Sequence, residues 1–239
     1  VVAGGERQNV KLNLKVAGEV VANHGYNEGN RMSRINWLNS TKGIDNKITK
    51  GYQPVLLKGK EISILGRKLY IGANGLPSSI TSYFGESNQS LVEKETPIVN
   101  KPFRFIVEKE NGDVIHLHAG ELIFTEQSQS QVAWKVVNTS DECMLECTGK
   151  IEFDGFVDYQ LKLTALAVLK IKDIRLEIPV EKDRAKYMMG LGHEGGLRNA
   201  DWEWKWDVSK NQDMLWIGDV NGGIRVKWKA KNYVRPLVN

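Results

Sequence analysis

The chain has 239 residues, of which 41% are hydrophobic and 26% are charged, and its net charge is +4. This composition is typical of a globular protein and excludes wholesale disorder. Lys and Arg are interleaved with Asp and Glu instead of forming a basic stripe, so nucleic-acid binding, which needs clustered cations, is not expected. The longest apolar stretch, residues 163–169, is far shorter than the roughly 20 residues of a spanning helix, so no membrane insertion is expected.

The two ends of the sequence indicate a piece of a larger protein. The first residue is Val1 instead of Met, and no signal peptide precedes the first strand pattern. We therefore predict an internal or amino-terminal fragment of a multidomain protein, with any targeting segment outside it. Residues 1–239 are expected to form a single β-sandwich domain, in which residues 1–50 are a more loosely packed segment.

Short strands dominate the predicted elements. Apolar residues alternate with polar ones over residues 10–16, which predicts a half-buried strand. Residues 25–50 are rich in Asn, Gly, Ser and Thr and are expected to be mostly loop. From Val55 onward the pattern predicts antiparallel strands at residues 61–65, 68–71, 79–84, 103–109, 114–118, 121–125, 132–137, 143–153, 157–167, 168–179, 214–218 and 224–228.

Turn signals separate these strands. Asn-Gly pairs at residues 74–75, 111–112 and 221–222 accept the positive φ of tight hairpin turns. The glycine-rich residues 188–197 are expected to form a loop. About fourteen strands with almost no helix exceed a seven-stranded immunoglobulin-like sandwich. The predicted fold class is therefore all-β, as a large antiparallel two-sheet sandwich.

The two cysteines, Cys143 and Cys147, lie on one predicted strand. A four-residue offset places them on the same face about 13 Å apart, beyond the roughly 7 Å limit between bridged Cα atoms. We therefore expect two reduced thiols in the core.

Residues 201–207 are the most unusual stretch of the sequence. Trp202, Trp204 and Trp206 share one face of an extended chain, with rings about 7 Å apart. Such rings can form a platform for sugars, whose C–H faces pack on aromatic surfaces. The alternative is that this face is buried in the core or against another domain, where large aromatic residues often lie.

Two polar residues lie in the glycine-rich loop just before these tryptophans. Glycines let a ligand approach His193 and Glu194 closely, so both join the candidate carbohydrate-binding residues. An alternative is acid–base sugar chemistry, resembling that of epimerases or lyases, with His116 as a further candidate.

Other catalytic and metal-binding patterns are incomplete. His116 and His118 can share one side of a strand, but no third ligand lies near them, so a polar sheet face is expected. The sequence has no phosphate-binding loop and no nucleophile elbow. We therefore expect no metal, no cofactor and no catalytic residue in this chain.

Several stretches carry a family resemblance, namely residues 33–40, 64–67, 74–77, 152–155 and 190–229. Together they resemble the amino-terminal β-sandwich region of bacterial proteins related to glycoside hydrolase family 123. The resemblance implies a supersandwich of the galactose-mutarotase type preceding a catalytic barrel in a multidomain protein that degrades polysaccharide or glycan. It also implies an N-acetylated galactoside as substrate class, with the catalytic acids in the barrel.

The resemblance implies a non-catalytic accessory domain of a glycoside hydrolase. Such a domain packs on the catalytic domain of the same polypeptide and contacts glycan or polysaccharide. A sugar-active enzyme domain and a purely structural spacer stay open as alternatives. A periplasmic or extracellular location is also implied.

Overall fold

The computed structural model describes residues 11–15, 18, 22–25, 45–205 and 213–229. Contacts between residues divide the chain into two units, residues 1–45 and 46–239. A single domain over residues 1–239 stays a prediction. No helix among the described residues is long and apolar enough to cross a membrane.

The described part of the first unit contains a 3-10 helix, Ala22–Gly25. The strand predicted at residues 10–16 is wrong over residues 11–15, which form no strand and leave Leu12 and Leu14 exposed. The backbone groups of a strand need a hydrogen-bonded partner, and these residues pair with no other described residue. Alternation of apolar side chains alone therefore did not produce a strand.

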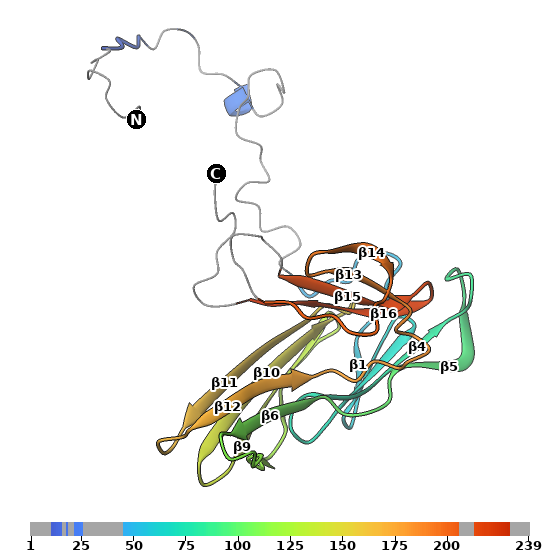
Figure 1. Ribbon diagram of the computed structural model, residues 1–239. Coiled ribbons are helices and arrows are strands. Elements are labelled where there is room, and N and C mark those ends of the chain that lie inside the picture. The colour runs from blue at the N-terminus through green and yellow to red at the C-terminus, as the bar shows by residue number, and fades with distance from the viewer. Residues whose placement is uncertain (1–10, 16–17, 19–21, 26–44, 206–212, 230–239) are drawn as a thin grey trace. The chain divides into compact units, whose positions relative to one another are not determined.

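The second unit contains four antiparallel sheets (Figure 1). The first sheet is a meander in the order β1-β2-β3-β4-β5. Its strands are β1 (Leu56–Lys58), β2 (Glu61–Ile64), β3 (Arg67–Ile71), β4 (Pro77–Phe84) and β5 (Leu91–Val99). The second sheet has the order β11-β10-β9-β7, with β8 also paired to β9. Its strands are β7 (His118–Ala119), β8 (Ile123–Gln127), β9 (Gln131–Thr139), β10 (Cys143–Glu152) and β11 (Val157–Ala165).

The other two sheets are smaller. A two-stranded ribbon pairs β6 (Arg104–Lys109) with β12 (Ile171–Glu177). The fourth sheet has the order β14-β13-β15-β16. Its strands are β13 (Tyr187–Gly190), β14 (His193–Leu197), β15 (Met214–Asp219) and β16 (Gly222–Lys227). The described residues contain no α-helix, which agrees with the predicted all-β class.

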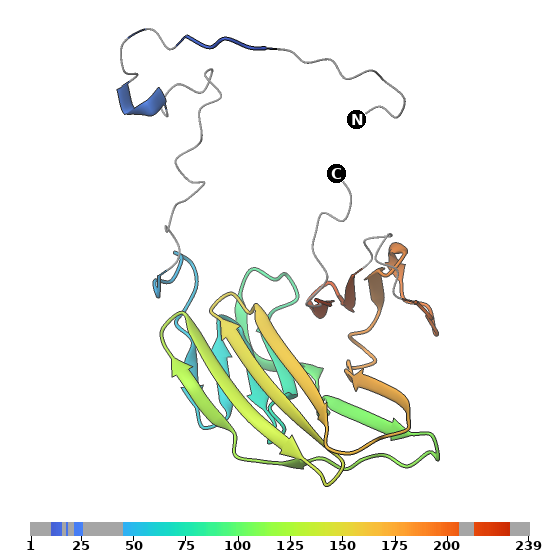
Figure 2. The ribbon, with the colours of Figure 1, turned by 90° about the vertical axis from the view of Figure 1, so that its left-hand side faces the viewer.

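The first two sheets face each other across a shared core, so the predicted sandwich is confirmed. Figure 2 shows the strands of the second sheet in front of those of the first. Ile62 and Ile71 of the first sheet pack in one buried cluster with Trp134 and Ile151 of the second. The Trp134 indole Nε1–H donates to the Gly75 carbonyl, 2.8 Å away, and this bond joins the two layers.

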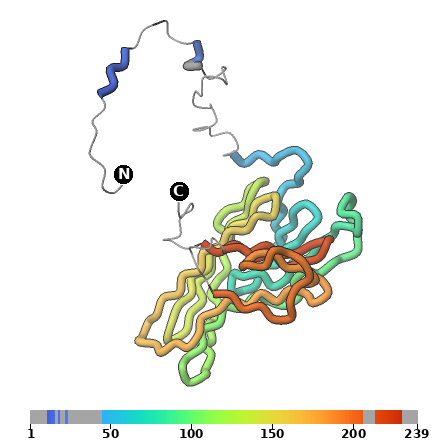
Figure 3. Tube along the Cα trace, turned by 45° about the horizontal axis from the view of Figure 1, so that its top comes forward, coloured from blue at the N-terminus to red at the C-terminus, as the bar shows by residue number. Residues whose placement is uncertain are grey.

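The fourth sheet is attached to the end of the first sheet. Ile224 of β16 packs against the buried cluster that contains Ile98 of β5. The Asn221 side-chain amide donates to the Glu86 carbonyl at 2.8 Å, and the Asn88 amide donates to the Val220 carbonyl at 2.7 Å. The orange and red trace of β13–β16 accordingly lies beside the β4–β5 hairpin (Figure 3).

Several elements of the second unit differ from the sequence-based predictions. Of the strand predicted at residues 114–118, only His118 lies in a strand, and β1 was not predicted. Residues 188–197, expected to be a loop, form the β13–β14 hairpin. Gly190 has φ 103°, and a Cβ there would lie 2.1 Å from the Met214 carbonyl oxygen, so the strand pairing itself requires this glycine. Strand β5 was not predicted, because Pro97 and three charged residues interrupt its pattern.

Both cysteines are free and buried on β10, as predicted. Burial raises the pKa of the Cys147 thiol to about 12. The folded protein therefore holds this proton more tightly than the unfolded chain, in which a thiol ionises near pH 8.5. The contribution of this protonated thiol to the free energy of unfolding is fully present below about pH 8.5 and is lost as pH rises toward about 12.

We expect the unfolding free energy of the wild type, relative to Cys147→Ala, to fall by about 1 kcal/mol between pH 9 and 10. Urea unfolding at several pH values measures this difference. The difference should be constant below about pH 8. A pH-independent difference across the whole alkaline range would contradict the account of the buried thiol.

Candidate functional site

The best-defined aromatic site lies where the β13–β14 turn meets the segment after β14. The turn residues Gly190, Leu191 and Gly192 all have positive φ, of 103°, 52° and 81°. Leu191 is buried, and its N–H donates to the Met214 carbonyl at 3.1 Å. The turn is therefore held firmly against β15.

Trp202 packs on this turn. Its Nε1–H donates to the Leu191 carbonyl at 3.2 Å, and its ring meets the His193 ring edge-on, with centroids 5.3 Å apart. Trp202 nevertheless remains 41% exposed. We call Leu191, His193 and Trp202 the Trp202 corner.

The hydrogen bonding of His193 fixes which of its ring nitrogens is free. The Gly195 N–H donates to His193 Nδ1 at 3.2 Å. In the neutral ring this assigns the proton to Nε2, because an accepting nitrogen carries none. Nε2 is thus a donor that a ligand hydroxyl can use.

The other predicted site residues are not all gathered in this corner. Glu194 is exposed on β14, and Trp204 is half-buried in a segment that forms no strand. Trp206 lies outside the described residues. The structure thus brings together Trp202 and His193, which the sequence analysis had treated as separate motifs.

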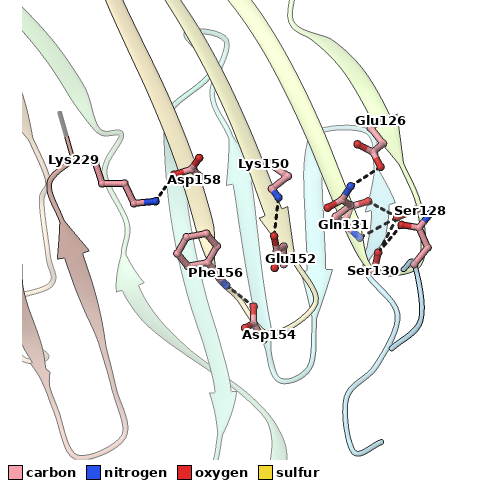
Figure 4. A network of polar contacts seen from close by, with 11 residues as sticks. Glu126, Ser128, Ser130, Gln131, Lys150, Glu152, Asp154, Phe156, Asp158 and Lys229 are labelled. Atoms are coloured by element: carbon pink, nitrogen blue, oxygen red, sulfur yellow. Dashed lines mark hydrogen bonds and ion pairs between the residues drawn. The ribbon is translucent and has the colours of Figure 1, made fainter. Parts of the chain in front are cut away.

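A second polar region lies at the ends of β9, β10 and β11, and its carboxylates have partners within the chain (Figure 4). Glu152 accepts from Lys150 at 2.7 Å, and this bond raises the pKa of Lys150. Asp158 pairs with Lys229 at 3.2 Å. The Asp154 carboxylate accepts the Phe156 N–H at 2.8 Å and so closes the β10–β11 turn. These interactions stabilise the sheet ends.

The described residues contain no group of three His, Cys, Asp or Glu side chains placed to hold a metal ion. His116 and His118 are both exposed near the short strand β7. This position agrees with the polar face predicted for them.

Comparison with known proteins adds one match. A family model described as glycoside hydrolase 123, third domain, matches residues 55–239. The chain belongs to the glycoside hydrolase 123 family. The match covers every strand from β1 to β16 and the Trp202 corner. No curated protein and no solved structure matches the chain.

Membership in the glycoside hydrolase 123 family confirms the resemblance inferred from the sequence. Of the stretches that carried it, residues 64–67, 74–77, 152–155 and 190–229 lie inside the matched range, and residues 33–40 lie outside it. The description as a third domain places this domain among others in a multidomain family, and it differs from the amino-terminal position that the resemblance had implied.

Sequence reasoning missed one group of aromatic and apolar residues in this family member. Tyr187 and Met189 on β13 share a sheet face with Trp216 on β15. Because residues 188–197 were expected to be a loop, the alternation along β13 was not recognised. The period of two at residues 187–190 was the signal that could have shown it.

Proposed function

We propose that this chain is a non-catalytic accessory domain of a glycoside hydrolase. It packs on the catalytic domain of the same polypeptide, and it contacts carbohydrate through the Trp202 corner. The polypeptide that carries it is exported to the periplasm or the extracellular space, where polysaccharide is degraded. Family membership supports the accessory role, and the geometry of the corner supports the sugar contact.

The observation that carries the sugar contact is an exposed but immobilised tryptophan. The bond to Leu191 and the His193 ring hold the Trp202 indole in place, while 41% of the residue stays accessible. A preorganised aromatic surface costs little conformational entropy when a sugar packs on it. The neighbouring His193 Nε2 supplies a hydrogen-bond donor for a hydroxyl group.

The two alternatives have less support. An epimerase-like or lyase-like site uses His193 and Glu194 or His116 as acid and base. His116 lies in no strand and Glu194 is exposed on β14, and the described contacts of His193 are with Gly195 and Trp202. A spacer without a ligand predicts buried tryptophans, whereas Trp202 is exposed.

Calorimetric titration of the chain with a panel of glycans tests the sugar contact. Trp202→Ala should weaken binding roughly 3- to 10-fold, the range expected for one aromatic contact. Trp228→Ala is the matched control, because Trp228 is similarly exposed, at 38%. Absence of binding to every glycan, or equal losses in the two variants, would contradict the proposed contact.

A further inference from the structure

One face of the fourth sheet points away from the sandwich. Met188 is buried and Ile224 packs on the core, so the residues that alternate with them along β13 and β16 point outward. The strand register extends this outer face across all four strands. Its members are Tyr187, Met189, Glu194, Leu197, Met214, Trp216, Gly218, Gly223, Arg225 and Lys227.

The outer face exposes a contiguous apolar surface. Tyr187 and Leu197 are directly opposite each other, and Met189 is opposite Trp216. Leu197 is 74% exposed and Met189 is 44% exposed. Exposed large apolar side chains that adjoin one another in this way mark an interaction site, whereas isolated ones are ordinary.

Glycines make the outer face unusually flat. A Cβ on Gly218 would lie 2.7 Å from Cζ2 of Trp216, so the indole covers the backbone at Gly218. Gly223 lies opposite Gly218 and adds no side chain there. A partner surface can therefore approach the Trp216 ring closely.

The chemistry of the outer face fits a protein better than a sugar. Its composition of Tyr, Trp, Met, Leu and Arg matches the buried centre of protein–protein interfaces. Exposed Glu194, at the β13–β14 bulge opposite Met189, is its one acidic residue, and no Asp, Asn or Gln occupies its outward positions. A carbohydrate would find a single carboxylate and no side-chain amide on this face for its hydroxyl groups.

The charges of the outer face narrow the choice of partner. Arg225 and Lys227 are its two cationic residues and Glu194 is its one anionic residue, and Lys227 lies 3.9 Å from Asp213. The described residues place no carboxylate within 4.0 Å of the Arg225 guanidinium, whose contact is with the Met214 sulfur. The matched family model describes a third domain, so other domains of the same polypeptide are available as partners. Two cations against one carboxylate favour an acidic surface on that partner.

We propose that the outer face of β13–β16 is the docking surface for another folded domain of the same polypeptide. That domain presents an apolar patch with a carboxylate opposite Arg225. This inference rests on the proposed function, in which the chain packs on the catalytic domain of the same polypeptide. It identifies the surface through which the chain packs. Covalent linkage favours such docking, because it keeps the two domains at high effective concentration.

Hydroxyl-radical footprinting tests the assignment by comparing the 239-residue chain with the intact polypeptide. Met189, Tyr187 and Trp216 should be labelled several-fold less in the intact polypeptide. Phe156, exposed at the β10–β11 turn, should be labelled equally in both. In the intact polypeptide, Leu197→Asp should restore labelling of Met189.

Val168→Asp is the matched control, because Val168 is fully exposed outside this face and tolerates a charge. Equal effects of the two substitutions on Met189 labelling, or equal labelling of Met189 in the 239-residue chain and the intact polypeptide, would overturn the assignment.

Protection of Phe156 in place of Met189 would overturn the assignment of the surface while leaving domain packing intact. Protection nowhere in the domain would contradict the packing itself. Protection of Met189 by a glycan in the 239-residue chain would make the face a carbohydrate site and overturn the proposal.

Discussion

Trp134→Ala is expected to lower the free energy of unfolding by about 3–5 kcal/mol. Trp134 is among the largest fully buried side chains and contacts both layers of the sandwich. Its removal leaves a cavity beside Tyr159, whose ring is 5.7 Å away. It also leaves the buried Gly75 carbonyl without its indole donor. Urea unfolding followed by circular dichroism measures the loss.

Two further variants test whether the loss comes from the buried ring. Trp134→Phe keeps an aromatic ring but not the indole N–H, so its cost should be smaller. Trp228→Ala removes an exposed indole and should cost much less than Trp134→Ala. Trp134→Ala and Trp228→Ala with equal costs would contradict the assignment of Trp134 to the centre of the core.

Arg184→Ala is expected to cost about 3–5 kcal/mol, because it leaves a buried carboxylate without its cation. Asp219 is 4% exposed at the end of β15 and pairs with Arg184 from the segment before β13. The same carboxylate accepts the N–H groups of Asn221 and Gly222 at 2.9 and 3.0 Å. It therefore fixes both the β15–β16 turn and the approach to β13. Urea unfolding measures the cost.

Asp219→Asn should cost less than Arg184→Ala. An amide oxygen still accepts the two turn N–H groups, and the partly exposed Arg184 can turn to solvent. Hydrogen exchange should show faster exchange at Asn221 and Gly222 in Arg184→Ala than in Asp219→Asn. A cost of Arg184→Ala below that of Asp219→Asn would show that the pair does not stabilise the sheet.

Much of the sandwich could be predicted from local sequence. The turns at Gly75 and Gly112 have the expected positive φ, of 83° and 89°. The β15–β16 turn lies one residue earlier than predicted, at Val220 and Asn221, because Gly222 pairs with Asp219. Period-two alternation identified β9 and β10, because each has one buried face and one polar face. The sequence of such a strand specifies its pairing register, since a slip of one residue would expose the apolar side chains.

The errors arose where pairing partners or backbone contacts decide the structure. Residues 10–16 alternate correctly, but residues 11–15 have no described strand partner. The glycines of residues 188–197 indicated a loop, although Gly190 is required by its contact with the Met214 carbonyl within a paired sheet. Neither fact is visible in a single segment, because each depends on residues elsewhere in the chain.

The candidate site was only partly predictable for the same reason. The sequence indicated Trp202 and His193 as residue types suited to sugars, but their ring contact depends on the tight turn at Leu191. The outer face of β13–β16 depends on the register of four strands that are discontinuous in sequence. Composition could suggest the chemistry, whereas the pairing determined which residues meet.

Hydrolysis by the intact polypeptide, with and without Trp202→Ala, tests the central claim that this chain is an accessory domain that contacts carbohydrate. On polymeric substrate, KM should rise roughly 3- to 10-fold with kcat unchanged, because the lost aromatic contact is remote from the bond that breaks. On a short aryl glycoside, neither constant should change. A fall in kcat on both substrates would instead place Trp202 in the catalytic machinery. Unchanged KM and kcat on both substrates would contradict the carbohydrate contact.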